Sequence, residues 1–355
     1  MSVKFIAEAG VNHNGNAEMA FQLVDAAIAA GADAVKFQTF NAEALASVAA
    51  PKAAYQNKTT NSSESQLDML KRLELPKPLH FKLYEYCCKN DIAFLSSPFD
   101  LNSLKFLINE LGLTTIKVPS GEITNGPFLL EIAKNGCDVI LSTGMSTLEE
   151  VKKALSVLAF GFTSKNIPPS SKKFGHAFNS DEGQKMLRDK ITILHCTSSY
   201  PTPLEDANIL AMVTMRETFG LRVGFSDHTE GHIAAITSVA LGASIVEKHF
   251  TLDRGLSGPD HKASLQPNEL GALISEIRNI ELALGDGLKQ PQKSEHETIA
   301  IVRKSLMALN SIEKDTLFTS ENLGAKRPGN GISPMRYWDW LGQPAHRKFD
   351  KEELL

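Results

Sequence analysis

The chain has 355 residues, of which 42% are hydrophobic and 22% charged, and its 37 basic and 41 acidic side chains give a net charge of −4. This composition is typical of a globular protein with a full core, and the charge argues against a broad surface for nucleic acid or anionic membranes. The N-terminal residues lack the apolar core of a signal peptide, and no run of about eighteen apolar residues would span a bilayer. The four cysteines form no CxxC pair, which indicates a reduced protein that we expect in the cytoplasm.

Eight short apolar or β-branched runs recur along the chain, and each ends in polar residues. The runs begin at Phe5, Ala34, Ala93, Thr115, Val139, Ile191, Val223 and Ile245. Helical periodicity occupies the stretches that begin at Ala17, Pro78, Leu101, Asn125, Thr147, Ala207, His232 and Pro267. This alternation predicts a (β/α)8 TIM barrel, whose active site lies at the carboxyl ends of the strands. An open doubly wound sheet is disfavoured, because the sequence AEAGVNHNG after the first run is not GxGxxG.

Three segments depart from this alternation. Residues 41–75 form a long polar connection after the second run, which we expect to cover the substrate. Residues 163–190 resemble an inserted surface connection, to which we assign no chemistry. Residues 286–293 are a linker rich in Gly, Lys and Pro, and they separate a barrel of residues 1–285 from a small domain of residues 294–355. At roughly sixty residues, that domain is near the lower size limit for independent stability.

Two lysines lie near the ends of predicted strands, Lys36 in the second run and Lys117 in the fourth. Because two lysines pointing into one barrel mouth would repel, we expect an anion such as phosphate between them, with Ser120 and Ser142 as hydroxyl donors. A surface salt bridge is the alternative for either lysine alone. Glu8, at the end of the first run, would bind a polyol or act as a base, and a structural ion pair is its alternative.

Two histidines follow the seventh and eighth runs, His228 and His249. They are the best predicted metal ligands, because neutral imidazole is the commonest protein ligand for divalent first-row ions. A lone barrel histidine is more often structural, but a pair on adjacent strands favours a metal. Asp260, in a GPD turn, would complete the site or bind substrate, and Tyr200 would line the pocket. The set suits a metal-assisted reaction of a phosphorylated anion, and no GxSxG or Cys–His signature indicates a nucleophilic hydrolase.

A series of longer motifs resembles the sialic acid synthase family nearly end to end and in the family's order. The motifs are EAGVNHNG, KFQT, SSPFD, KVPSGE, LSTGM, HCTSSYPTP, FSDHT, EKHFTLDRGLSGPDHKASL and KRPGNG. Within the family, the chain is similar to bacterial N-acetylneuraminate synthases. The resemblance implies a TIM barrel followed by a small antifreeze-like (SAF) domain, a domain-swapped homodimer, and a divalent metal, Mn²⁺ or Mg²⁺. It also implies a transferase that condenses phosphoenolpyruvate with an N-acylated mannose-type sugar and water, releasing phosphate.

The resemblance further implies a role for individual residues. The metal ligands match His228 and His249. The phosphoenolpyruvate contacts match Lys36, Lys117, Ser120 and Ser226, to which we add the hydroxyls of Ser142 and Ser198. Some family members have asparagine at the position of Ser198, and serine can still donate to phosphate over a shorter reach. The sugar contacts match Glu8, Gln38, Phe99, Tyr200, Asp260 and, from the small domain of a partner subunit, Arg327.

The implied reaction uses the metal to polarise the open-chain sugar aldehyde, which the enol carbon of phosphoenolpyruvate attacks. Glu122 positions the water that then adds, while Glu8 and Lys117 complete the catalytic set. The expected sugar is N-acetylmannosamine, and the alternative is the legionaminic acid precursor 2,4-diacetamido-2,4,6-trideoxymannose. The segment GPDHKASL argues against the pseudaminic branch. Outside the family, the alternatives are a non-catalytic sugar- or anion-binding barrel and a metal-dependent aldolase that uses pyruvate.

Overall fold

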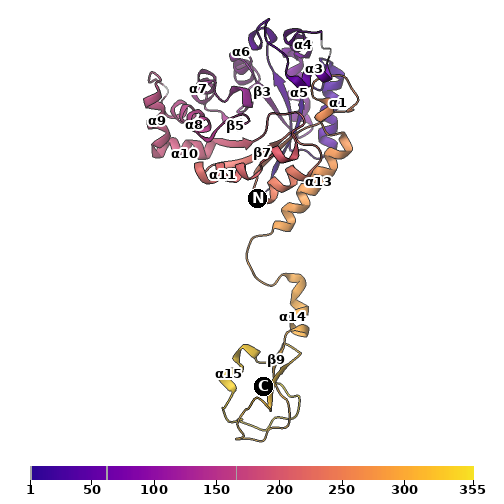
Figure 1. Cartoon of the computed structure of the whole chain (residues 1–355), viewed down its shortest axis with the longest axis vertical. Helices are drawn as coiled ribbons and strands as arrows, with labels where there is room; N and C mark the ends of the chain where they lie inside the picture. The colour runs from indigo at the N-terminus through magenta and orange to yellow at the C-terminus, as the bar shows by residue number, and fades with distance from the viewer. Residues whose placement is uncertain (1, 61–62, 165) are drawn as a thin grey trace. The chain divides into compact units, whose positions relative to one another are not determined.

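The computed structural model describes residues 2–60, 63–164 and 166–355, and it divides into two compact units, Met1–Gly285 and Asp286–Leu355. The larger unit contains eight parallel strands (Figure 1). They are β1 (Lys4–Gly10), β2 (Ala34–Thr39), β3 (Ala93–Pro98), β4 (Thr115–Val118), β5 (Asp138–Ser142), β6 (Ile191–His195), β7 (Arg222–Asp227) and β8 (Ile245–His249). Their hydrogen-bonded order is β3-β2-β1-β8-β7-β6-β5-β4, and the two end strands β3 and β4 also contact each other. The sheet therefore curls into a nearly closed barrel, which confirms the predicted (β/α)8 class.

One layer of helices follows the strands as predicted. It consists of α1 (Ala17–Ala29), α5 (Lys77–Lys89), α6 (Leu101–Lys105), α7 (Gly126–Lys134), α8 (Leu148–Thr163), α11 (Leu210–Phe219), α12 (Ile233–Ala240) and α13 (Pro267–Leu284). Local sequence fixes where they begin. The side chain of Asn16 accepts a hydrogen bond from the Met19 amide at 3.0 Å, and Thr147 and Glu150 form a reciprocal capping box at the start of α8. These caps satisfy amides that the first helical turn leaves unpaired.

Two connections contain more regular structure than the sequence patterns predict. Residues 41–75 include the short helices α2 (Ala42–Leu45), α3 (Ala54–Thr59) and α4 (Gln66–Leu73), and residues 163–190 include α9 (Ser171–Asn179) and α10 (Asp181–Lys190). Both predictions of irregular connections were therefore incomplete. Ser170 and Ser180 cap α9 and α10, and both helices pack against α8 (Figure 1). Because both segments are mostly polar, the short apolar faces with which these helices pack were not recognised in the sequence.

The barrel has two separate apolar cores, because side chains alternate between the faces of each strand. The larger core lies between the outer strand faces and the helices and includes Phe5, Phe37 and Phe225. The smaller one fills the barrel interior and consists of one residue from each of six strands: Ile6, Ala34, Leu95, Ile140, Leu194 and Ile245. This inner layer closes the barrel, so that a ligand can enter only from the strand ends above it.

The smaller unit, Asp286–Leu355, has its own apolar cluster, which includes Leu306, Phe318 and Phe349. It contains α14 (His296–Val302), an antiparallel pair of strands β9 (Ser305–Ala308) and β10 (Leu323–Lys326), and α15 (Tyr337–Trp340). Over the described part of the whole chain, no helix is long and apolar enough to cross a membrane.

Candidate active site

Polar side chains form a second layer directly above the inner apolar layer. Two residues beyond each inner-core position in the chain come Glu8, Lys36, Ser97, Ser142, Cys196 and Glu247. Because strand side chains repeat with a period of two, these residues face the same interior. All of them except Cys196 line one cavity of about 640 Å³, together with Lys117 of β4 and Ser226 of β7. The apolar floor therefore changes to a charged and hydroxyl-rich layer within one repeat.

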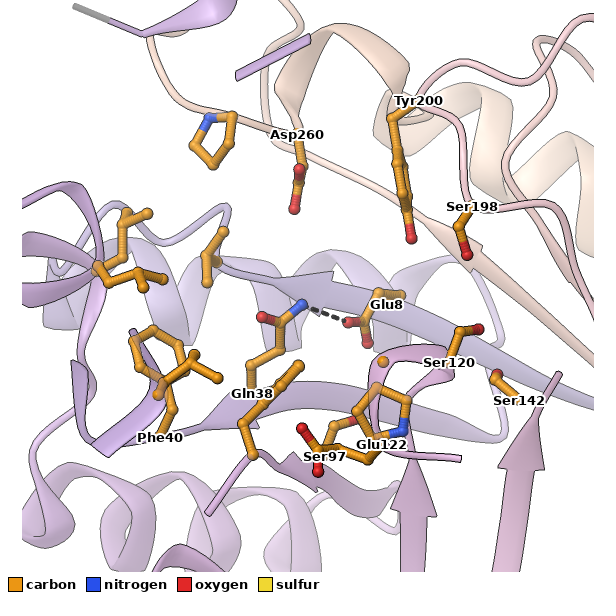
Figure 2. Close-up of a pocket in the computed structure, with 18 of the residues that line it drawn as sticks. Glu8, Gln38, Phe40, Ser97, Ser120, Glu122, Ser142, Ser198, Tyr200 and Asp260 are labelled. Carbon is orange, nitrogen blue, oxygen red and sulfur yellow. Dashed lines mark hydrogen bonds between the residues drawn. The ribbon is translucent and has the colours of Figure 1, made fainter. Parts of the chain in front are cut away.

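Every barrel residue that the sequence assigned to the site lines this cavity. They are Glu8, Lys36, Gln38, Phe99, Lys117, Ser120, Glu122, Ser142, Ser198, Tyr200, Ser226, His228, His249 and Asp260. Arg327 lies instead in the smaller unit, where its Nε donates to the carbonyl of Val302 at 2.9 Å. The single cavity shows that residues spread over some 250 positions of sequence meet at the strand ends (Figure 2).

Four charged side chains form a chain of alternating sign at the bottom of the cavity. Glu8 Oε2 lies 2.7 Å from Lys36 Nζ, which lies 3.7 Å from Glu247 Oε2. Glu247 Oε1 accepts a hydrogen bond from Lys117 Nζ at 3.1 Å and another from Ser226 Oγ at 2.9 Å. Glu247 was not identified from the sequence, and its carboxylate supplies a negative charge of the protein itself between the two lysines, beside which a bound anion stays a prediction.

Burial and mutual attraction set the charge states of this network. Burial raises the pKa of Glu8 to about 7, against the opposing effect of Lys36. Burial also favours neutral Glu247, but Lys117 and Lys36 overcome it and lower its pKa to about 2. Burial acts to lower the pKa of both lysines. At Lys36 the attraction of Glu247 and Glu8 outweighs burial, and the pKa is raised. At Lys117 the effect of burial is larger than that attraction, and the pKa is lowered. Glu247 is therefore the fixed negative charge, and Glu8 titrates near neutral pH.

His228 and His249 are buried in the lining of the cavity as neutral imidazoles. Burial lowers the pKa of His228 to about 4 and that of His249 well below its usual value. His228 Nδ1 is 2.7 Å from the carbonyl of Thr197 and must donate to it, which leaves Nε2 without a proton. The two ring centroids are 5.8 Å apart, and the Tyr200 ring lies 4.2 Å from that of His228.

These two imidazoles fit a divalent cation, although they would supply only part of its coordination shell. His249 Nδ1 is buried and has no hydrogen-bond partner among the described residues, as expected of a nitrogen positioned for another ligand. The described residues contain no group of three or more His, Cys, Asp or Glu side chains that could hold a metal ion. The remaining ligands would have to be water or substrate oxygens, as in an open catalytic site.

Three loops meet at Gly144 on one side of the cavity. Its amide donates to Ser120 Oγ at 3.1 Å, and Ser120 Oγ lies 3.1 Å from Cys196 Sγ. A Cβ at Gly144 would stand 2.3 Å from Ser198 Oγ and 2.8 Å from Ser120 Oγ, so no side chain fits there. The absence of a side chain lets the hydroxyls of the loops after β4 and β6 converge. Ser142 Oγ, buried nearby, has no hydrogen-bond partner within the described chain.

The upper part of the cavity is lined by groups that suit a polyol. Gln38 Nε2 donates to Glu8 Oε1 at 3.4 Å, and Figure 2 shows both side chains in the middle of the cavity. Asp260 lies above them, and burial raises the pKa of its carboxyl to about 6. Glu122 lies on a short 3₁₀ turn, Ser120–Glu122, where its Oε2 accepts a hydrogen bond from Asn125 at 2.6 Å.

Residues 41–60 and 63–75, the described part of the long second connection, contribute to the lining of the cavity, and we call residues 41–75 the covering segment. Several of its side chains line the cavity, including Leu45, Met69 and Leu73. Thr59 Oγ1 donates to the carbonyl of Pro259 at 3.2 Å, which joins the covering segment to the turn that contains Asp260. The covering segment therefore forms one wall of the cavity and is attached to the β8 loop opposite.

Comparison with known proteins identifies the family. The family model described as the NeuB family matches residues 23–289. The chain is 49% identical to an N,N'-diacetyllegionaminic acid synthase of Campylobacter jejuni, over 99% of this chain and 98% of that protein. It is 42% identical to the corresponding synthase of Legionella pneumophila, over 96% and 90%. A crystal structure of an N-acetylneuraminic acid synthetase from Leptospira borgpetersenii matches with a TM-score of 0.67 and 33% identity, over 84% of this chain and 90% of that one. The chain therefore belongs to the NeuB family, the sialic acid synthase family that its motifs resemble.

Proposed function

We propose that the protein is a sugar-acid synthase that condenses phosphoenolpyruvate with the open-chain aldehyde of an N-acylated mannose-type sugar. The main support is that two lysines, four serines, two neutral histidines and all the barrel residues assigned as sugar contacts line one cavity. Water is the third reactant, and the products are a nine-carbon 2-keto-3-deoxy acid and phosphate.

The phosphoenolpyruvate would lie on the serine side of the cavity. Lys36 and Lys117 attract its negative charges as point charges, and their alternation with Glu247 holds the ammonium groups in place before the ligand arrives. The hydroxyls of Ser120, Ser142, Ser198 and Ser226 are available as donors. Because Ser142 Oγ has no partner within the described chain, an arriving anion would satisfy it.

The sugar would lie above that anion, with its aldehyde toward His228 and His249. A divalent ion held there, Mn²⁺ or Mg²⁺, would polarise the aldehyde. The C–C bond forms between the methylene carbon C3 of phosphoenolpyruvate and the aldehyde carbon, and the aldehyde oxygen takes up a proton. Water held by Glu122 adds to C2, the carbon that carries the phosphate, and cleavage of the bond between C2 and the phosphate oxygen releases phosphate and leaves the keto group. Glu8, with its pKa near 7, is positioned to hold or release a proton near the sugar hydroxyls.

Two sugars fit this proposal. N-acetylmannosamine is the substrate that the motifs favour, and it would make the protein an N-acetylneuraminate synthase. The diacetamido-trideoxymannose is favoured by the names of the relatives at 49% and 42% identity. Incubating the full-length protein with phosphoenolpyruvate, Mn²⁺ and each sugar, and measuring phosphate and 2-keto-3-deoxy acid, tests the reaction and ranks the sugars.

The same assay separates the proposal from its alternatives. A non-catalytic binding barrel would release no phosphate with any sugar, and an aldolase would form product from the sugar when pyruvate replaces phosphoenolpyruvate. We further propose that the smaller unit is the antifreeze-like domain of a domain-swapped homodimer, in which Arg327 contacts the N-acyl group in the partner subunit's site. Four free cysteines favour a cytoplasmic location.

A further inference from the structure

An apolar wall lies at the end of the cavity away from Ser142 and Ser198. The wall consists of Val11, Phe40, Met69, Leu70, Leu73 and Phe99, which all line the cavity and pack together as one cluster. They come from four places in the chain: the loop after β1, the residue after β2, helix α4 and the residue after β3. The Phe40 and Phe99 rings pack edge to face, with centroids 6.2 Å apart. The wall is therefore an assembled surface and not a chance exposure of one side chain.

The wall lies at the far end of the cavity from the reacting groups. In Figure 2, Ser142 and Ser198 lie at one end, Phe40 lies at the other, and Glu8 and Gln38 lie between them. Tyr200, whose ring contacts both His228 and His249, is at the serine end. A sugar with its aldehyde at the histidines would extend past Glu8 and Gln38. Its last carbons would then contact the wall.

The chemistry of the wall suits some sugar ends and not others. Ordinary hexoses bring hydroxyls to C4 and C6, and a hydroxyl pressed against aliphatic and phenyl groups loses its hydrogen bonds to water without replacement. A methyl group at C6 has no such penalty and gains apolar contact. At the edge of the wall, Gln66 lines the cavity, and among the described residues its amide has no hydrogen-bond partner. A side-chain amide can both donate to and accept from an acetamido group.

We infer that the apolar wall and Gln66 select a 6-deoxy sugar with an acylated amine at C4. This inference rests on the proposed condensation and names the part of the cavity that chooses between its two sugars. The wall contacts the C6 methyl group, and Gln66 pairs with the C4 acetamido group. N-acetylmannosamine, with hydroxyls at both carbons, is then the poorer substrate.

Assays with three sugars measure the contributions of the C6 methyl group and the C4 acetamido group separately. The full-length protein with Mn²⁺ is assayed for kcat/KM with N-acetylmannosamine, with 2-acetamido-2,6-dideoxymannose, and with 2,4-diacetamido-2,4,6-trideoxymannose. We expect the C6 methyl to raise kcat/KM about tenfold to a hundredfold over the C6 hydroxyl, the range in which apolar pockets discriminate. The C4 acetamido group should add a further increase.

Variants then assign the two effects to residues. Leu70→Gln places an amide in the wall at a half-buried position and should reduce the preference for the C6 methyl, with the KM for phosphoenolpyruvate unchanged. Gln66→Leu should reduce only the contribution of the C4 acetamido group. Val48→Gln is the matched control, because Val48 belongs to the same covering segment but is 83% exposed and does not line the cavity.

The outcomes are distinguishable from those of the reaction itself. Comparable kcat/KM values for all three sugars, each with phosphate release, would overturn the selective wall and leave the proposed condensation standing. A wild-type preference that Leu70→Gln and Gln66→Leu both leave unchanged would also overturn it. Release of no phosphate with any sugar would remove the proposed function and this inference together.

Discussion

The buried charge network offers a direct test through Glu247→Gln. The substitution keeps the shape of the side chain and removes the fixed negative charge from a group of two carboxylates and two lysines, so the network becomes more positive by one charge. Lys117 Nζ, at 3.1 Å, and Lys36 Nζ, at 3.7 Å, both lose their closest shared countercharge. Breaking a buried ion pair on one side costs about 3–5 kcal/mol. Because glutamine can still accept from Ser226, we expect the low end, about 3 kcal/mol, in the free energy of unfolding.

Inorganic phosphate should reverse part of this loss, since the uncompensated lysines then bind an anion more tightly. At a hundred times its dissociation constant, a ligand stabilises the folded state by about 2.7 kcal/mol. The measurement is urea unfolding with and without phosphate, followed by far-ultraviolet circular dichroism. Tryptophan fluorescence would be unsuitable, because both tryptophans, Trp338 and Trp340, belong to the smaller unit.

The matched control is Asp227→Asn. Asp227 pairs with Lys248 at 2.7 Å and is equally buried, but neither residue lines the cavity. This variant should lose comparable stability, and phosphate should stabilise it no more than it stabilises the wild type. If Glu247→Gln were as stable as wild type, or if phosphate stabilised both variants equally, the assignment of Glu247 as the countercharge of an anion site would be wrong.

Four further predictions address the rest of the site. An excess of chelator should abolish phosphate release and Mn²⁺ should restore it, whereas full activity in chelator would exclude the metal role. Burial raises the pKa of Glu8 from 4.5 in the unfolded chain to about 7 in the folded protein. The stability that this carboxyl contributes is therefore complete below pH 4.5, and about 3 kcal/mol is lost as the pH rises through 7. Glu8→Gln should flatten this part of the curve of unfolding free energy against pH, and parallel curves for variant and wild type would contradict the assignment. Gly144→Ala should displace the Ser198 hydroxyl and reduce kcat/KM for phosphoenolpyruvate about tenfold to a hundredfold, and an unchanged KM for that substrate would argue against the serine-side anion site. Mixing inactive Arg327→Ala and His228→Ala subunits should recover up to about a quarter of wild-type activity if Arg327 serves the partner subunit, and no recovery would place it in its own barrel's site.

The sequence allowed the barrel and most of its site to be predicted, because strand ends are the one place where a buried apolar run becomes polar. Glu247 escaped this reasoning although it lies in the run IVEKHF. Its neighbours Lys248 and His249 drew attention as the last residues of the strand. Counting in steps of two from Ile245 would have placed Glu247 and His249 in the interior and Lys248 outside, where it pairs with Asp227.

The helices of the covering segment and of residues 171–190 could not be predicted with the same reasoning. Each has at most ten residues, and short helices depend on packing more than on their own propensity. In α9, the helical spacing of Phe174, Ala177 and Phe178 was a usable signal, because these residues pack on the main core. Ser170 and Ser180, which cap α9 and α10, mark both starts, but serine is too common in loops to indicate a cap without that spacing.

The lining residues of the cavity lie at different depths, and this arrangement has a consequence for the order of binding. Lys36, Ser97 and Ser142 lie one strand repeat above the closed apolar floor of the barrel, whereas Tyr200, Asp260 and the covering segment come from loops beyond the strand ends. With a single open end, a sugar that arrived first would block the way to the floor. Under the proposed condensation, we expect phosphoenolpyruvate to enter before the sugar in each turnover, and phosphate to leave after the sugar acid. The depth of the cavity would thus determine the order in which the two substrates bind and the two products leave.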